Sequence, residues 1–222
     1  MLMLIGFYPF YRHGTGFAGR RIDPVILPVV LVHGIAIAAW FVLFLVQSLL
    51  ISARNRKLHM KLGWSAIGIG LTIACTGTMV AVRSVQISPQ ILFFGMEYTR
   101  FLLVMLTEIA SFSLFITVGL LTRKKPKIHR SMMLLASLTL IAGATARIPA
   151  FFSIFGKTGW VGLFGPVFCL GAILLAVRFA TTRTFDRWFA GAYAFWVAAY
   201  ISSTSLSLTD AWSRVATKIL AL

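Results

Sequence analysis

Six long apolar runs fill this sequence, and its charged residues lie almost entirely between them. Each run has about 20 residues or more, and a helix of that length, with a rise of about 1.5 Å per residue, crosses a hydrocarbon core of roughly 30 Å. We therefore predict an all-α fold, an integral membrane bundle of six transmembrane helices. The runs cover residues 24–52, 64–85, 101–122, 132–155, 160–180 and 188–209.

The composition agrees with a membrane protein. Of the 222 residues, 59% are hydrophobic and only 12% are charged. Six spans and their short connections use up the chain, so no room remains for a soluble domain. We expect one transmembrane domain at 24–209, an extracytoplasmic, interfacial leader at 1–23 and a short tail at 210–222. The first run is too long for a cleaved signal peptide, and no small-residue cleavage site ends it.

The net charge of +16 comes largely from basic residues that gather in three connecting loops. Loops 53–63, 123–131 and 178–187 hold 12 of the 21 Lys and Arg residues, whereas the two loops on the opposite side hold only Arg83, Arg100 and Lys157. Lys and Arg beside membrane spans set orientation and contact anionic lipid head groups. We therefore predict a multi-pass protein of the bacterial inner membrane with these three loops in the cytoplasm and both termini outside it. Membrane lipid, and not nucleic acid, is the expected partner of this charge.

Three ionisable residues lie well inside the runs, which is costly in a membrane and typical of residues that face the interior of a bundle. His33, Glu108 and Arg147 each lie about 7 or 8 residues, on the order of 10–12 Å, from the predicted outer end of their helix. We therefore predict one polar pocket in the outer half of the bundle. Its predicted ligand-binding residues are His33, Glu108, Arg147, Arg83, Trp40 and Tyr200. The alternative is structural: Glu108 and Arg147 form an ion pair that only locks two helices together.

A short internal similarity places two further histidines in equivalent positions. Residues 57–77 align with 127–144, so that His59 matches His129, and the first four helices read as a repeated hairpin. Such repeats often pack around a pseudo-symmetry axis with a site between them. His59 and His129 are therefore candidates for a metal ion or a bis-imidazole haem. Their basic neighbours favour a second interpretation, in which both are interfacial anchors that contact lipid phosphate.

Several segments resemble a family of uncharacterised bacterial inner-membrane proteins. They are YPFY (8–11), HGIAIAAWFVLFLVQSLLI (33–51), LHMKLGW (58–64) and IHRSMMLLASLTLIAGATARIP (128–149). The resemblance covers roughly residues 8–150 and implies a six-span protein without implying a reaction. A weaker resemblance connects the chain to six-helix di-haem transmembrane cytochromes, which carry two histidine pairs in four consecutive helices. Only His33 of the four histidines here lies well inside a span, so no stoichiometric haem is expected.

No motif for a known reaction is present, and we predict no catalytic residue. The leading hypothesis is a non-enzymatic membrane protein that binds or passes a small molecule, ion or electron carrier through the polar pocket. A second hypothesis is a structural or accessory subunit of a larger membrane complex, with partner subunits on its basic face. A third is a haem- or metal-binding redox protein that uses His59 and His129.

Overall fold

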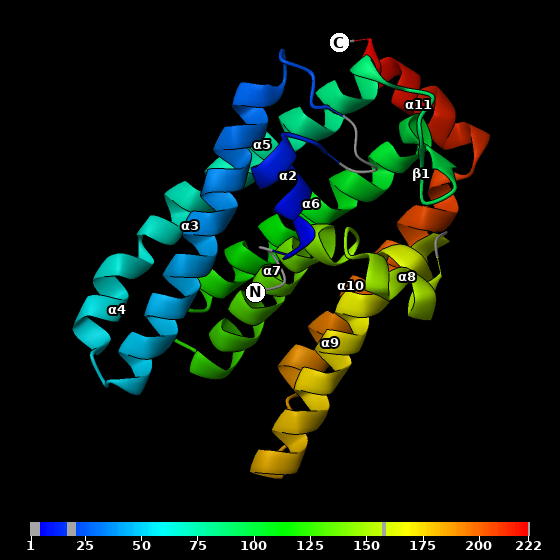
Figure 1. Cartoon of the computed structure of the whole chain (residues 1–222). Coiled ribbons are helices and arrows are strands. Elements are labelled where there is room, and N and C mark those ends of the chain that lie inside the picture. The colour runs from blue at the N-terminus through cyan, green and yellow to red at the C-terminus, as the bar shows by residue number, and fades with distance from the viewer. Residues whose placement is uncertain (1–4, 17–20, 157–158, 222) are drawn as a thin grey trace.

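The computed structural model describes residues 5–16, 21–156 and 159–221, and these residues are almost wholly helical (Figure 1). The all-α prediction is confirmed, with one small β-hairpin as the exception. The elements, in chain order, are α2 (Tyr8–His13), α3 (Leu27–Ser52), α4 (Arg56–Gly63), α5 (Ser65–Ile87), β1 (Leu92–Phe93), β2 (Met96–Glu97), α6 (Tyr98–Leu121), α7 (Pro126–Thr145), α8 (Pro149–Phe155), α9 (Gly159–Thr182), α10 (Arg187–Ser207) and α11 (Asp210–Leu220).

Five helices of the described chain are long and apolar enough to cross a membrane. They are α3, the continuous stretch from α4 to α5 (Arg56–Ile87), α6, α7 and α9. Helix α10 has 21 residues but is not among them. Its length would suffice, and the polar side chains in its second half, such as Ser202, Ser203 and Ser205, lower its hydropathy.

Three features of the helices differ from the predicted runs. The fourth apolar run is divided: α7 ends at Thr145, and Pro149 begins the short helix α8, because proline has no N–H for a preceding helical turn. The predicted basic loop 53–63 contains α4, whose first turn is capped by the Asn55 side chain, 3.1 Å from the Leu58 N–H. The predicted tail at 210–222 contains α11, capped by Thr209.

Helix α6 lies at the centre of the bundle, where it packs against α5, α7, α10 and α11, while α3 packs on α5. Small residues allow the closest approaches. At Gly119 of α6, a methyl group would lie 2.8 Å from the Met133 Sδ of α7, and at Gly70 of α5 it would overlap the Ile116 side chain of α6. A larger side chain at either position would require the Met133 or Ile116 side chain to move.

One end of the bundle is joined by Asp186, which is buried at the start of α10. Its carboxylate accepts hydrogen bonds from Ser131 Oγ of α7 at 3.0 Å and from the Phe189 N–H at 3.1 Å, and it forms an ion pair with Arg178 of α9. Asp186 therefore connects three helices. Nothing in the sequence pattern pointed to this residue.

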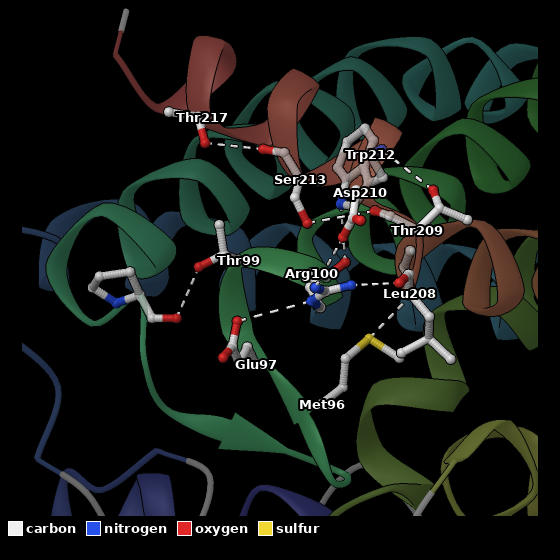
Figure 2. A network of polar contacts seen from close by, with 12 residues as sticks. Met96, Glu97, Thr99, Arg100, Leu208, Thr209, Asp210, Trp212, Ser213 and Thr217 are labelled. Carbon is white, nitrogen blue, oxygen red and sulfur yellow. Dashed lines mark hydrogen bonds and ion pairs between the residues drawn. The ribbon is translucent and has the colours of Figure 1, made fainter.

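The opposite end is held by Arg100, on the first turn of α6 (Figure 2). Its guanidinium donates to the Leu208 carbonyl at 2.5 Å and lies 3.8 Å from Asp210 and 3.9 Å from Glu97. The Arg100 carbonyl accepts from Trp212 Nε1 at 3.2 Å. These contacts fix the β-hairpin and α11 against the helices that enclose the cavity described below.

The N-terminal segment packs against the bundle at Gly6 and Phe7, whereas most of the α2 residues that follow are exposed. Gly6 is buried, and a methyl group at this position would overlap the main chain of Ala144, near the end of α7. Helix α2, dark blue in Figure 1, follows directly. The close contact at Gly6 requires glycine because the two main chains touch.

Candidate functional site

A cavity of about 680 Å³ lies among α3, α5, α6, α7 and α9, and the N-terminal segment forms part of its wall. His33 of α3, Glu108 of α6 and Arg147, in the turn after α7, all line it. Most of the remaining wall is apolar and aromatic, including Phe93, Phe101, Phe112 and Phe164. The structure therefore places the three predicted ionisable residues on one cavity.

His33 is oriented by a hydrogen-bond chain that ends on the main chain of α5. Its Nδ1 lies 3.0 Å from Thr76 Oγ1, and the Thr76 hydroxyl donates its proton to the Thr72 carbonyl at 2.5 Å. Because that hydroxyl has only one proton, Thr76 must accept from the His33 Nδ1–H. In the neutral ring Nε2 is then the acceptor nitrogen. Gly77 leaves room for the ring, since a methyl group there would lie 3.0 Å from His33 Cε1.

Arg147 lies just beyond the end of α7, where its side chain turns back over the last helical turn. Its guanidinium donates to the Gly143 carbonyl and lies over the Phe7 ring, 4.7 Å from the ring centroid. The guanidinium has five N–H donors. Within the described chain, Gly143 is its one hydrogen-bond acceptor, so most of these donors are available on the cavity wall.

Glu108 of α6 is half-buried and faces the same cavity. Its carboxylate makes no hydrogen bond and no ion pair within 4.0 Å to any described residue. It is close enough to Arg147 and to Tyr200 for electrostatic interaction. The direct ion pair that would lock α6 to α7 is therefore not formed, and both charged groups remain accessible from the cavity.

The other three predicted ligand-binding residues lie off the cavity wall. Trp40 is buried with its Nε1–H 3.1 Å from Ser137 Oγ and its ring edge against Phe112. Tyr200 is buried edge-on against Phe164, with ring centroids 4.1 Å apart, and its hydroxyl has no hydrogen-bond partner among the described residues. Arg83 is exposed and donates to Gln86 Oε1 at 3.3 Å. None of the three is part of the binding site proposed below.

Sequence reasoning missed the residues of the N-terminal segment that complete the cavity. Gly6, Phe7, Pro9 and Phe10 all line it, although they precede the first apolar run. The six residues of α2 are too few to show a helical period. One local signal in the sequence could have indicated a packed segment. Aromatic residues flank Pro9 close to Gly6, in a segment that was expected at the membrane interface.

His59 and His129 meet at the other end of the bundle. Their ring centroids are 6.3 Å apart and their planes cross at 88°. His129 Nδ1 lies 2.8 Å from the Gly119 carbonyl, whereas His59 Nδ1 is enclosed without a hydrogen-bond partner in the described part of the chain. The described residues contain no group of three or more His, Cys, Asp or Glu side chains that could hold a metal ion.

No family model, curated protein or solved structure matches this chain.

Proposed function

We propose that this protein binds a small amphipathic molecule in the cavity, with the polar group of that molecule between Glu108 and Arg147. The observation that carries the proposal is that these opposite charges border one cavity without contacting each other. Ionisable groups inside a membrane bundle are costly and are usually kept for a ligand, an ion or a proton. A polar group of a bound ligand would provide hydrogen-bond partners for both Glu108 and Arg147.

The wall of the cavity supports a particular ligand chemistry. A guanidinium with unused N–H donors favours carbonyl, carboxylate or phosphate oxygens. His33 Nε2 and the Glu108 carboxylate add acceptors for a hydroxyl or N–H group. The aromatic wall suits an apolar body, and a volume of about 680 Å³ lies in the usual range for small-molecule pockets. Amphipathic acids and lipid-soluble electron carriers with carbonyl groups meet this description.

The membrane arrangement that we propose has six spans, with α10 as the sixth. Several polar residues of its second half, Ser203, Thr204 and Ser207, are buried against the protein. Their hydroxyls donate to carbonyls of their own helix, and Ser207 also contacts Met96 Sδ at 3.2 Å. A helix with satisfied, inward-facing hydroxyls can cross the membrane despite its lower hydropathy.

We further propose that the chain belongs to the bacterial inner membrane and to the six-span family it resembles. The residues of the segments that resemble this family support the proposal, because they lie at two polar sites of the fold, the cavity and the His59–His129 pair. His33, Gly34 and Arg147 line the cavity. His59 and His129 occupy matching positions of the two proposed hairpin repeats and lie side by side.

Ligand identification tests the proposed function directly. The protein is extracted from its native membrane into lipid nanodiscs, and bound molecules are released and analysed by mass spectrometry. We expect one small amphipathic molecule in stoichiometric amount. Co-purifying protein subunits with an empty cavity would instead favour the accessory-subunit hypothesis.

A further inference from the structure

Three polar side chains from three helices converge at the end of the bundle opposite the cavity. His59 comes from α4, His129 from α7 and Gln47 from α3. The two imidazole centroids are 6.3 Å apart, and the His59 ring also lies beside the Gln47 main chain. Gln47 reaches the end of α4, since a methyl group at Gly63 would lie 3.8 Å from Gln47 Nε2.

The hydrogen bond of His129 determines which of its nitrogens can bind a ligand. A carbonyl oxygen can only accept, so the bond of 2.8 Å to the Gly119 carbonyl requires a proton on His129 Nδ1. In the neutral ring, Nε2 then carries a free lone pair. A ring held through one N–H by a carbonyl, with the other nitrogen free, is the usual arrangement of a metal-binding histidine.

The remaining polar atoms of this cluster are enclosed without partners. His59 Nδ1, Gln47 Oε1 and Gln47 Nε2 have no hydrogen-bond partner within the described chain. Buried polar side-chain atoms are nearly always satisfied by protein, water or a bound ion. Three such atoms beside a preoriented imidazole indicate a small occupant.

We propose that His59 and His129 bind one divalent transition-metal ion, with Gln47 Oε1 or water as a further ligand. In a tetrahedral site with metal–nitrogen distances of about 2.0–2.1 Å the two ring centroids would lie roughly 5 Å apart. The rings are 6.3 Å apart here, so binding would have to draw them closer together. Imidazole nitrogen suits zinc, copper, iron and nickel. This site is separate from the cavity and does not depend on the proposed function.

The charges around the site give the proposal an unusual consequence. The neighbouring charged residues on α4 and α7 are all basic: Arg56, Lys57, Lys61, Lys127 and Arg130. They repel a metal cation, and salt screens this repulsion. Metal affinity should therefore rise with ionic strength. A phosphate ion or lipid phosphate bound by the same residues would show the opposite dependence.

The experiment is a titration of the full chain, prepared without a histidine tag in nanodiscs of neutral lipid, with Zn²⁺ by calorimetry and Co²⁺ by visible absorption. We expect one ion per chain, and an affinity that increases when salt is raised from about 0.01 to about 0.1 M, which shortens the Debye length from roughly 30 to 10 Å. His59→Ala and His129→Ala should each weaken binding more than about tenfold, since even outer-shell partners are worth that much. The control is His13→Ala, whose exposed imidazole lies on α2.

Several results would overturn the proposal. One is metal binding no stronger than in a variant that carries both His59→Ala and His129→Ala. Another is binding that is unchanged in both single variants. A third is binding that weakens with salt and is displaced by inorganic phosphate. A Soret band after expression with ample haem, lost in both single variants, would assign the pair to haem instead. If His129→Ala does not fold, His59→Ala decides alone, because His59 Nδ1 has no hydrogen-bond partner among the described residues.

Discussion

Glu108 of α6 and Arg147 at the end of α7 border one cavity, yet among the described residues no ion pair of 4.0 Å or less joins them. A pair that served only to lock two helices would be in contact, because an uncompensated charge inside a bundle is costly. The separation of the two groups is the basis for treating the cavity as a binding site.

The first prediction concerns the stability of Glu108→Gln. Since Glu108 has no direct partner in the described chain, the amide removes an unpaired charge without breaking a bond. The melting temperature should stay the same or rise, while the bound molecule is lost. Thermal unfolding followed by tryptophan fluorescence measures the first effect. A clear drop in melting temperature with the ligand retained would support the structural alternative.

The N-terminal segment gives a second prediction, tested with Gly6→Val. A side chain at Gly6 would overlap the Ala144 main chain, so the segment should leave its place on the cavity wall. The bond after Arg12, on α2, should then be cut much faster by trypsin. Cleavage is followed by mass spectrometry. The matched control is Gly68→Val on α5, where a methyl group meets no atom within 4 Å. Equal cleavage rates in the two variants would contradict the fold of this segment.

A third prediction compares two carboxylates at opposite ends of the bundle. Asp186 is 6% exposed and bonds to three helices, so Asp186→Asn should destabilise the protein by about 1.5–3 kcal/mol, the usual worth of hydrogen bonds to a charged group. Asp210 is exposed and lies 3.8 Å from Arg100, so Asp210→Asn should cost less than about 1 kcal/mol. Chemical unfolding of both variants measures the difference. Equal losses of unfolding free energy in the two variants would show that Asp186 does not connect α7, α9 and α10 as described.

Membrane orientation supplies a fourth prediction. Both native cysteines, Cys75 and Cys169, are exposed, free thiols and must first be replaced. Lys125→Cys and Lys218→Cys then place single thiols at the two ends of the bundle, both at exposed positions. In intact cells, a membrane-impermeant maleimide should label the thiol at 218 and leave the thiol at 125 unlabelled. The reverse pattern would invert the proposed topology.

The helices could be predicted, and so could the presence of three ionisable residues on one cavity, because both follow from positions counted along the apolar runs. An apolar run predicts a helix, and similar positions within three runs place His33, Glu108 and Arg147 at a similar level of the bundle. The direction in which each helix face points is harder to predict from the sequence. Two predicted cavity residues therefore lie elsewhere: Arg83 is outside the cavity, and Trp40 is buried against Ser137 and Phe112.

Contacts made by short or irregular segments could not be predicted at all. The insertion of Gly6 and Phe7 depends on a main-chain contact with α7, which no periodic pattern encodes. The role of Asp186 depends on where α7 and α9 bring Ser131 and Arg178, two residues that are distant from each other in sequence. Such sites depend on tertiary structure rather than on local sequence.

The central claim, that the cavity binds a small molecule through Arg147, is tested most directly by the amount of bound molecule per chain in a matched pair of variants. Arg147→Met removes the donors on the cavity wall, and Arg83→Met removes an exposed arginine that lies off that wall. Arg147→Lys, which keeps the charge but loses the planar fork, serves as a second variant if Arg147→Met is unstable. We predict that Arg83→Met retains the molecule while folded Arg147→Met and Arg147→Lys lose most of it. Retention of the molecule in both Arg147 variants would contradict this account.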